Sequence, residues 1–554
     1  MHRSLPHAFS PRSFSMRSFA RLLFAATVLS AALAAPAPAQ LRIVEPAAST
    51  SRDSVIERGV MLERQLKWGE ALSHYEDALK DIPGDPQLSQ RADWAKIHYN
   101  LARRYADTSF RTSVVTLNVR EALDLYNEIL LKIQTHYVDN VDWRHLVRRG
   151  TRTLEIALGE PAFVDTNLRS VSTSQAENAL LRLRSVIDRQ PIHNRRDAVA
   201  AVGQAAQTLH HELGIRPAAV VMEYVSGASG GLDTYSTYLT GDQLREVYSQ
   251  IDGNFVGLGI EMKAGEGALV LVAVIPGSPA DRAGMTASDR ILAVDGQSTA
   301  DITTEKAASL LQGPQGSVVE LLLASAAGTT RLIRVRREQV VVPSIHDAKI
   351  VDAAAGIAYL KMVSFQRDTS RDLDATLWDL YRRGMKSLII DVRGNPGGLL
   401  SSAVDVSDKF IYQGKIVSTR GRNHEEDYDY AARRANTWGV PLVVLIDHDS
   451  ASASEIFAAA ISDQRRGTIV GSRSYGKGSV QGIFPLGHAE AGLRLTTAKF
   501  YSPGGRPISG AGVSPDLQVH EVAKPQFDGP AAQSEDRALQ AAVQAAQGQL
   551  TRRQ

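Results

Sequence analysis

The sequence predicts a multidomain α+β protein, in which a helical N-terminal region precedes a small mainly-β module and an α/β core. Three observations support this. Up to about residue 250, apolar residues recur at helical spacing. Near residue 251, short strands separated by glycine and proline turns begin. From about residue 346, buried strands alternate with amphipathic helices, as in an α/β layer structure.

The composition narrows the class of protein. The 554 residues are enough for three or four domains of ordinary size. The formal net charge of +2 provides no large basic field, so we expect no nucleic-acid partner. The sequence contains no cysteine, which excludes disulfides, cysteine-based metal sites and a lipid-modified N-terminal cysteine.

Residues 1–39 are predicted to be an export signal. Arginines precede an apolar run at 22–35, and Ala-Pro-Ala at 37–39 matches a cleavage site, so the mature chain would begin at Gln40. The apolar run is short for a bilayer span. We therefore expect an exported, periplasmic protein. The alternative is a membrane anchor formed by an uncleaved signal.

Residues 40–110 are predicted to be helical and to contain a hairpin similar to a tetratricopeptide repeat. Small and large residues from Gly69 to Pro83 follow the spacing of such a helix pair. Because one repeat cannot bury its apolar face alone, an ordinary amphipathic hairpin packed on the rest of the protein is an equal alternative. We consider an adaptor protein as a partner of this region.

Residues 111–250 are predicted to form a helical cap region. Leu123, Tyr126, Ile129 and Ile133 share one helical face, which indicates a buried stripe. The stretch 165–215 is polar and rich in arginine and glutamine, and we expect it to be an exposed helical insertion of unassigned function.

Residues 251–345 have the order of elements found in a PDZ domain. After Gly-Leu-Gly-Ile at 257–260 come strands at 268–275 and 290–294, a helix at 304–312 and strands near 318–323 and 331–337. Their order and the glycine turns between them resemble a PDZ domain over about 85 residues. The resemblance implies that Gly257, Leu258, Gly259 and Ile260 form a loop whose N–H groups bind a peptide's terminal carboxylate, while the adjoining strand edge pairs with the peptide.

Residues 346–520 are predicted to be the α/β core, and 521–554 a C-terminal tail. The core elements are expected as strands at 356–363, 387–392 and 441–447 and helices at 373–383 and 401–410. The tail is rich in alanine and glutamine; it could form a helix, but it carries no chemical motif.

A glycine-rich turn, Asp391 to Gly398, follows one buried strand and precedes a helix. Its three glycines and one proline make a rigid turn that can bring backbone N–H groups close to a ligand. Taken alone, the turn is more simply explained as an ordinary strand-to-helix connection.

The run Ser450-Ala-Ser452-Ala-Ser454 follows the buried strand at 441–447 and precedes a strong helix-forming segment, 455–461. Ser452 is therefore expected at, or just before, a helix N-terminus, where free N–H groups and the helix dipole can stabilise an oxyanion. Helix capping accounts for one serine of this kind, but not for three alternating with alanine.

Lys477 lies between two glycines, 25 positions after Ser452. Most lysines are solvated surface charges. A lysine can nevertheless replace histidine as the base that activates a serine, provided that burial keeps its amine neutral. Gln481, four positions further on, could orient that amine by hydrogen bonding.

Two other motifs carry less weight. Residues 471–477 match the start of a phosphate-binding loop, but Gly478 stands where a serine or threonine should hold Mg²⁺. The acidic run at 425–429 is expected to be a solvated loop rather than a metal site. We expect neither a metal nor any other cofactor.

Together these motifs resemble the C-terminal processing peptidases, or tail-specific serine proteases. The resemblance covers about 119–160 and 222–520 and includes Leu-Asp-Thr-Tyr-Ser-Thr-Tyr at 232–238, where the family usually has proline in place of Thr234. It implies that Ser452 is the nucleophile, Lys477 the general base and Gln481 the third member, with Asp463 in a supporting role.

We assign the oxyanion hole to the N–H groups of Gly398 and Ala453, with Gly397 as a further candidate. The resulting hypothesis is an exported serine endopeptidase that recognises apolar C-terminal tails of proteins or peptides through its PDZ domain and cleaves them through an acyl-enzyme. The main alternative is a catalytically silent PDZ and helical-repeat scaffold. A third alternative is an acyl-CoA enzyme on a similar α/β core, but the sequence has no complete phosphate-binding loop to support it. We also consider a homo-oligomer.

Overall fold

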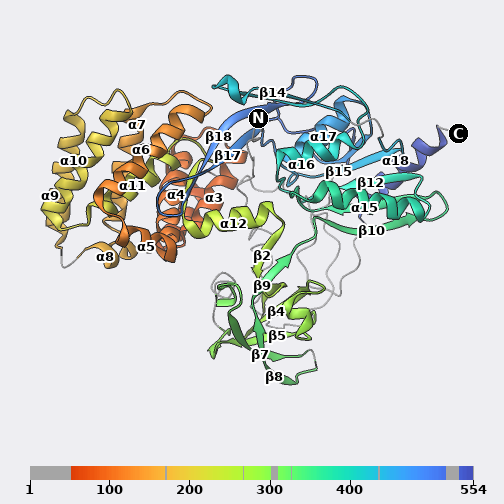
Figure 1. The fold of residues 1–554 in the computed structure, drawn as a ribbon, viewed down its shortest axis with the longest axis horizontal. Helices are drawn as coiled ribbons and strands as arrows, with labels where there is room; N and C mark the ends of the chain where they lie inside the picture. The colour runs from red at the N-terminus through yellow and green to blue at the C-terminus, as the bar shows by residue number, and fades with distance from the viewer. Residues whose placement is uncertain are drawn as a thin grey trace, which may run out of the picture. The chain divides into compact units, whose positions relative to one another are not determined.

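The structure of the chain is a computed structural model (Figure 1). It describes residues 52–168, 171–265, 267–300, 310–325, 327–433, 437–519 and 536–552. The expected export signal and most of the helix expected at 304–312 lie outside these residues. The described chain divides into two compact units: a helical unit, 52–244 with 484–495, and a second unit, 245–483 with 496–552.

The helical unit consists mainly of helices, which pack around a large hydrophobic core and, near the N-terminus, around a smaller one. Its helices are α2 (Arg52–Arg64), α3 (Trp68–Asp81), α4 (Pro86–Ala106), α5 (Thr108–Thr116), α6 (Val119–His136), α7 (Trp143–Ala157), α8 (Pro161–Asn167), α9 (Thr173–Arg189), α10 (Arg195–Leu213) and α11 (Pro217–Gly230). The helix α12 (Gly241–Ile251) follows the short strand β1 (Thr237–Leu239). The central helix is α11, which is apolar and buried along almost its whole length, as expected of a helix surrounded by others.

The buried stripe predicted around residues 123–133 is confirmed in α6. This helix begins with a capping box between Asn118 and Glu121, and Tyr126, Ile129 and Ile133 are fully buried. Nearer the N-terminus, α2, α3 and α4 pack around Tyr75, against whose ring Gly59 lies with no room for a side chain. The helical N-terminal region is thus confirmed, whereas its likeness to a tetratricopeptide repeat stays a prediction.

The expectation that 165–215 is an exposed insertion is wrong for much of α9 and α10. Both helices bury one face in the core of the helical unit. On α10 the buried face is a stripe of small residues: Ala198, Ala201, Val202, Ala205 and Ala206. The polar composition of the segment describes the opposite face, and alanines at helical spacing are enough to pack one helix closely against another.

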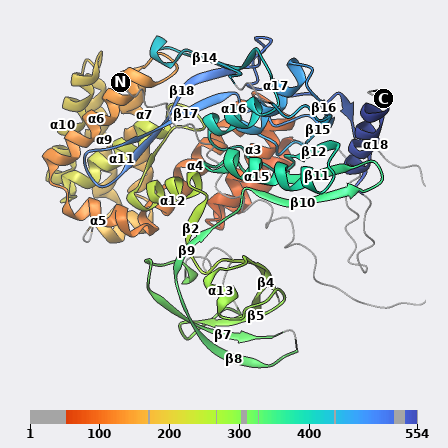
Figure 2. The ribbon, with the colours of Figure 1, turned by 45° about the vertical axis from the view of Figure 1, so that its right-hand side comes forward.

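The segment with the PDZ-like order forms a small antiparallel sheet with its own core. The strand order is β3-β4-β5-β7-β8, with β6 beside β5, and β2 pairs separately with β9 (Figure 2). The bounds are β2 (Asn254–Gly257), β3 (Ile260–Gly265), β4 (Ala268–Val274), α13 (Pro279–Arg282), β5 (Arg290–Val294), β6 (Gln297–Ser298), β7 (Val318–Ala324), β8 (Thr330–Arg336) and β9 (Glu338–Val341). Because β3 ends the strand order, one of its edges is left open within the described sheet.

The α/β core is built on a six-stranded sheet with the order β10-β11-β12-β15-β16-β19. The pair β10–β11 is antiparallel, and the strands from β11 to β19 run parallel. The bounds are β10 (Ile345–Asp352), β11 (Ile357–Met362), α15 (Thr369–Arg382), β12 (Ser387–Asp391), α16 (Leu400–Asp408), β15 (Leu442–Ile446), α17 (Ala453–Asp463), β16 (Thr468–Gly471), β19 (Leu517–Gln518) and α18 (Arg537–Thr551). The alternation predicted from the sequence is confirmed.

Both faces of this sheet are covered by helices. On one face α15, α16 and α17 pack against alternate strand residues such as Leu388 and Ile390. On the other face α18 packs three buried alanines, Ala538, Ala542 and Ala546, against residues such as Ile389. A parallel sheet needs both faces covered, which explains why β12 and β15 are buried throughout.

A second sheet combines β13 (Lys415–Gly421), β14 (Tyr428–Ala431), β17 (Ser479–Pro485) and β18 (Gly492–Tyr501) with β1, and the turn η1 (His424–Glu426) precedes β14.

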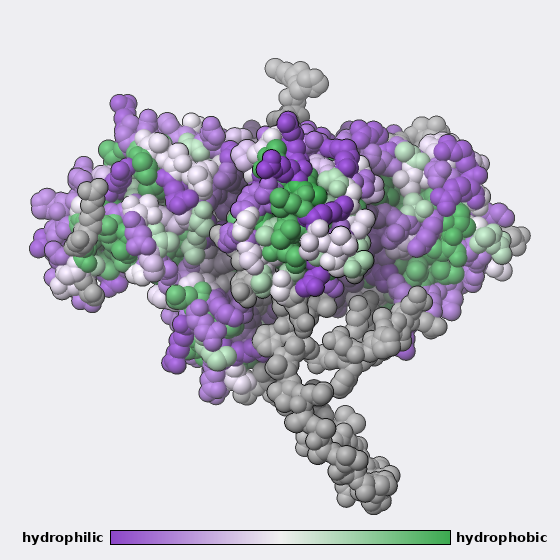
Figure 3. Space-filling model, turned by 90° about the horizontal axis from the view of Figure 1, so that it is seen from below, coloured by the Kyte–Doolittle hydropathy of each residue, from purple (hydrophilic) through white to green (hydrophobic). Residues whose placement is uncertain are grey.

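Hydrophilic residues cover most of the face seen in Figure 3, and hydrophobic residues gather there in separate patches. No helix among the described residues is long and apolar enough to cross a membrane.

Candidate active site

The glycine-rich turn and the serine run meet at one edge of the core sheet. The strands β12 and β15 are parallel neighbours, with Asp391 opposite Leu445, so the loops that follow them leave the sheet side by side. Asn395 joins the two loops: its buried carbonyl accepts hydrogen bonds from the Ala451 amide and the Ser454 hydroxyl, each at 3.0 Å.

Two of the three serines have structural roles. The Ser450 hydroxyl donates to the Val392 carbonyl at 2.8 Å, and the Ser454 hydroxyl donates to the Asn395 carbonyl. The Ser452 side chain, by contrast, belongs to the capping box at the start of α17, whose other member is Glu455. Ser452 is therefore the one member of the run whose hydroxyl is not used to join the loops.

Ser452 is the N-cap of α17, as predicted, and its backbone is strained. Its φ of 56° and ψ of −114° lie outside the regions that residues with a side chain ordinarily occupy. Strain of this kind costs of order 1–3 kcal/mol and persists only where the surrounding structure enforces it. The sharp turn places the serine directly at the N-terminus of a buried helix, where the dipole is positive.

Gly397 is the residue of the turn that lies against Ser452. A Cβ atom at this position would stand 2.8 Å from both the Ser452 Cβ and the Ala453 amide nitrogen, and φ is +103°. Gly398 is equally constrained, with φ at +147° and the Phe365 carbonyl oxygen 2.1 Å from where its Cβ would be. Glycine is thus required at both positions by close backbone approach.

The oxyanion-hole candidates differ in the availability of their N–H groups. The Gly397 amide already donates to Asn395 Oδ1 at 2.8 Å. Within the described chain, neither the Gly398 amide nor the Ala453 amide is paired with a backbone carbonyl. The geometry therefore favours the pair Gly398 and Ala453 over Gly397 as donors to a developing oxyanion.

Lys477 is buried, with 3% of its surface exposed, which agrees with the environment predicted for a lysine base. The flanking glycines allow this close packing. A Cβ on Gly478 would lie 2.2 Å from the Ser509 amide nitrogen, and Gly476 adopts a φ of +88°. The chain can therefore pass through a narrow space that larger residues would fill.

Glu455 links the nucleophile candidate to the base candidate. Its Oε2 accepts hydrogen bonds from the Ser452 amide and from the Lys477 amide, both at 2.8 Å. Its Oε1 accepts from the Ser474 hydroxyl and the Gly476 amide, both at 2.6 Å. Because one oxygen binds both amides, the backbones of Ser452 and Lys477 are held side by side.

The burial of Glu455 raises the pKa of its carboxyl, while these four hydrogen bonds act in the opposite direction. The role of Glu455 is not among the sequence predictions. The pattern Ser452-x-x-Glu455 in the sequence is that of a capping box, and the structure contains this capping box. What the spacing could not show is that the same carboxylate also binds the segment 474–477.

The other two predicted catalytic residues, Gln481 and Asp463, make hydrogen bonds to groups other than Ser452 and Lys477. Gln481 is buried and its Nε2 donates to the Ser479 hydroxyl at 2.8 Å, so its orienting role toward Lys477 stays a prediction. Asp463 ends α17, a helix of 11 residues that spans roughly 16 Å from Ser452. There it accepts a hydrogen bond from the Gly504 amide at 2.8 Å and pairs with Arg506, so any influence on the serine would be indirect.

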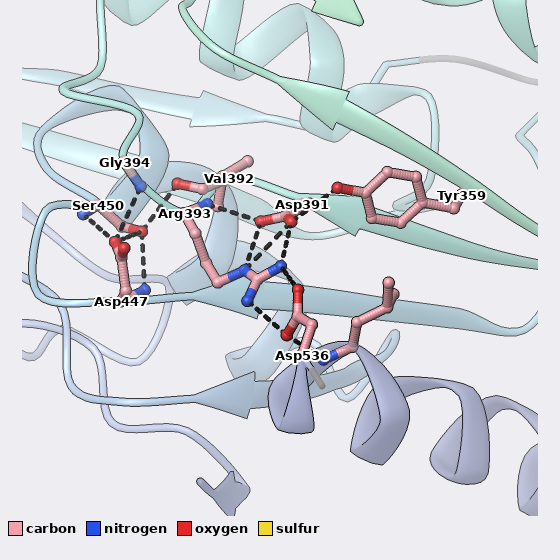
Figure 4. Close-up of polar contacts among 9 residues, drawn as sticks. Tyr359, Asp391, Val392, Arg393, Gly394, Asp447, Ser450 and Asp536 are labelled. Atoms are coloured by element: carbon pink, nitrogen blue, oxygen red, sulfur yellow. Dashed lines mark hydrogen bonds and ion pairs between the residues drawn. The ribbon is translucent and has the colours of Figure 1, made fainter. Parts of the chain in front are cut away.

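A charged cluster anchors the start of the glycine-rich turn (Figure 4). The Arg393 guanidinium binds Asp391, at the end of β12, and Asp536, the N-cap of α18. On the other side of the turn, Asp447 Oδ1 accepts from the Gly394 amide at 2.9 Å. The turn is therefore fixed from both sides before it reaches Gly397.

The four residues 257–260 connect β2 to β3. Leu258 buries its side chain in the core of the PDZ-like module, so it can meet a peptide only through its backbone. Gly259 has φ at +82° and lies against Ser278, whose Cβ is 2.2 Å from the position of a Cβ on Gly259. Ile260 begins β3, the strand with the open edge.

Comparison with known proteins agrees with this arrangement. Residues 356–519 match the model of peptidase family S41, and residues 270–325 match a PDZ domain. The carboxy-terminal-processing protease of Bartonella bacilliformis is 36% identical over 312 residues, which cover 55% of this chain and 70% of that protein. The carboxyl-terminal-processing protease of Picosynechococcus is 32% identical over 290 residues, 52% of this chain and 70% of that protein.

A third relative, the carboxy-terminal processing protease CtpA of Bacillus subtilis, is 30% identical over 301 residues, 53% of this chain and 64% of that protein. The fold and these matches define a serine peptidase that carries a PDZ domain. The chain belongs to the carboxy-terminal processing proteases of peptidase family S41.

Proposed function

We propose that the chain is an endopeptidase in which Ser452 and Lys477 form the catalytic dyad. The observation that carries the proposal is the shared carboxylate of Glu455, which holds the backbone of a strained N-cap serine beside that of a buried lysine. The four-carbon side chain of lysine is long enough to reach a neighbouring serine, and burial favours its neutral form.

The proposed reaction is acyl transfer. The neutral Lys477 amine takes the proton from the Ser452 hydroxyl as the serine oxygen attacks the substrate carbonyl. The amides of Gly398 and Ala453 donate to the oxyanion of the tetrahedral intermediate. The lysine then gives its proton to the departing amine, which leaves an ester on Ser452. Water, deprotonated by the same amine, hydrolyses the ester and restores the serine.

Substrate selection is proposed to lie in the PDZ module. A substrate's C-terminal residues would add to the open edge of β3, and its carboxylate would bind the N–H groups of the loop 257–260. We propose that the preferred substrates are proteins or peptides whose C-terminal tails end in apolar residues. An adaptor bound by α2–α4 and assembly into a homo-oligomer remain hypotheses.

The proposed site of action is the periplasm, after removal of residues 1–39. N-terminal sequencing of the protein recovered from a bacterial periplasm should begin at Gln40. A protein that stays in the membrane fraction and still begins at its first residue would instead indicate a membrane anchor.

The dyad is tested with an unfolded protein substrate that ends in apolar residues. Ser452→Ala and Lys477→Ala should each reduce kcat by about 10³-fold or more, because the members of a nucleophile–base unit act together. Lys386→Ala, which removes an exposed lysine of the same core, is the matched control and should cleave like the wild type. Cleavage retained by both dyad variants would refute the assignment, and a wild type that binds such tails without cleaving any of them would favour the silent scaffold.

A further inference from the structure

The C-terminal helix α18 contacts the active-site turn through one side chain. Asp536 is the N-cap of this helix and lies 143 positions after Arg393 in the chain. The Arg393 Nη1 donates to Asp536 Oδ1 at 2.9 Å, and its Nη2 donates to Asp536 Oδ2 at 2.7 Å. This two-point geometry fixes the plane of the guanidinium as well as its distance.

The same guanidinium neutralises a buried charge at the start of the turn. Asp391 is 1% exposed, and it accepts from Arg393 Nε at 3.0 Å and from Nη2 at 2.7 Å. Tyr359, on β11, donates its hydroxyl to the same carboxylate at 2.9 Å. A buried carboxylate without its cation would be strongly destabilising, so Arg393 cannot leave without disturbing the end of β12.

Arg393 is also part of the turn backbone. Its own amide donates to Asp391 Oδ1 at 2.9 Å, and the next residue, Gly394, donates to Asp447. Figure 4 shows the side chain held between Asp391 on the strand and Asp536 on the helix. Gly397 and Gly398 follow Arg393 by only four and five positions in the same turn.

The helix itself is firmly attached to the sheet. Its three buried alanines pack against the face opposite to α15, α16 and α17, and Gln547 Nε2 donates to Asp352 at 2.9 Å. Partial burial alone would raise the pKa of the Asp536 carboxyl. The hydrogen bonds from Arg393 and the Leu539 amide outweigh this effect and lower the pKa. The carboxylate is thus charged at neutral pH and remains a partner for the guanidinium.

We propose that α18 is a positioning element of the active site, in which Asp536 acts through Arg393 to fix the turn that carries Gly397 and Gly398. The inference rests on the proposed function, because it assigns the Gly398 amide to the oxyanion hole. Asp536 is a positioning residue that touches neither substrate nor the serine. A displacement of the turn by about 1 Å would lower the rate of acyl transfer by up to about a hundredfold.

The test uses Asp536→Asn in the full chain, because asparagine is as good an N-cap as aspartate and keeps the helix start intact. Gln547→Ala is the matched control, since it removes a polar contact of the same helix to the sheet away from the turn. With a short peptide substrate, Asp536→Asn should lower kcat between about tenfold and a hundredfold and leave KM within about twofold. Gln547→Ala should change neither.

A second readout does not depend on activity. Hydrogen exchange of the peptide spanning 391–400 should become faster in Asp536→Asn and stay unchanged in Gln547→Ala. If the exchange of this peptide is the same in both variants, the positioning role is overturned, whether or not the protein cleaves. If the exchange changes and wild-type protein cleaves while Asp536→Asn keeps its kcat, the role in catalysis is overturned and the proposed function stands. If exchange changes but even wild type cleaves nothing, the proposed function fails and only the mechanical link survives.

Discussion

Gly397 is the point at which the glycine-rich turn lies closest to the proposed nucleophile. A Cβ here would stand 2.7 Å from the Ala451 carbonyl oxygen and 2.8 Å from the Ala453 nitrogen, both of which are backbone atoms. We expect Gly397→Ala to reduce kcat by about 10² to 10³-fold, the cost of a displaced oxyanion donor. Steady-state kinetics with a peptide substrate measures this.

The matched control for that variant is Gly394→Ala in the same turn. Gly394 also has positive φ, +70°, but no atom lies within 4 Å of where its Cβ would be. It therefore carries the backbone strain without the steric overlap, and we expect a loss of activity below tenfold. Equal losses in the two variants would show that strain, and not the contact with the serine, governs the turn.

Glu455 gives the second prediction at the scale of single residues. Glutamine in its place keeps one acceptor oxygen and presents an amide N–H₂ to groups that are themselves donors. Each buried donor left without a partner costs about 1–3 kcal/mol, so we expect Glu455→Gln to lower the free energy of unfolding by about 2–4 kcal/mol. Urea denaturation measures this.

We also expect the kcat of Glu455→Gln to fall more than its KM rises, because the backbones of Ser452 and Lys477 lose their common acceptor. Glu425→Gln, on an exposed turn of the same unit, should leave stability and kcat unchanged. A Glu455→Gln enzyme with full activity would contradict the role given to the shared carboxylate.

The residue types of the site could be predicted from the sequence, but their connections could not. The spacing of Ser452 from a lysine between glycines indicates the dyad that we propose, and the helix-forming segment after Ser452 predicts the N-cap that the structure shows. The backbone strain at Ser452 and the close approach of Gly397 to this serine depend on how two loops approach each other. Such contacts between distant segments leave no local pattern.

The PDZ-like loop gives a prediction at the scale of a structural element. Gly259 has φ at +82°, and its missing side chain leaves room for Ser278. We expect Gly259→Ala to deform the connection between β2 and β3 and to weaken the binding of a peptide with an apolar C-terminus at least about tenfold, because the loop N–H groups lose their common direction. Fluorescence anisotropy in a Ser452→Ala background measures binding without cleavage.

Gly277→Ala serves as the control in the same module, since Gly277 has φ at +73° with no atom within 4 Å of a Cβ. Its affinity for the peptide should stay within about threefold of wild type, in line with the modest cost of a strained alanine. Unchanged affinity in Gly259→Ala would place the carboxylate-binding site elsewhere in the module.

Elements with strong periodicity were predictable, whereas those made of small residues were not. The alternating strands and helices of the core agree with the expected ranges to within a few residues. The polar composition around α10 predicts an exposed insertion, and the composition of the tail that contains α18 predicts a possible helix without a chemical motif. Alanine carries little signal on its own, and Asp536 acquires a role only beside an arginine that lies 143 positions earlier.

Both units of the molecule depend on carboxylates whose charged form is stabilised. In the helical unit, Arg149 binds Asp93 with contacts of 2.5 and 2.6 Å, and in the second unit Arg393 binds Asp536. Burial acts in the opposite direction, but the arginine partner lowers the pKa of both aspartates. Each pair therefore contributes stability above the ordinary aspartate pKa of about 3.9 and loses it as the pH falls through the lower folded-state value.

For two buried glutamates the pKa shift has the opposite direction. Burial raises the pKa of Glu223, which pairs with Arg104 in the helical unit, and that of Glu455 in the second unit. Each takes up a proton more readily in the folded than in the unfolded state, so acidification through the ordinary glutamate range does not remove stability through these two groups. Acid unfolding should accordingly be governed by the paired aspartates and begin below about pH 4.

Asp93→Asn tests this account in the helical unit. Asparagine cannot hold the charge that pairs with Arg149, so at pH 7 the free energy of unfolding should fall by about 1.5–3 kcal/mol, the contribution of hydrogen bonds to a charged group. The difference from wild type should shrink as the pH is lowered toward 3.5, because the wild-type carboxylate begins to protonate there as well. Urea denaturation at a series of pH values measures both.

Asp81→Asn, at the exposed end of α3, is the control and should follow the wild type at every pH. A difference between Asp93→Asn and wild type that stays constant from pH 7 to pH 3.5 would mean that the ion pair with Arg149 does not contribute to the acid sensitivity of this unit.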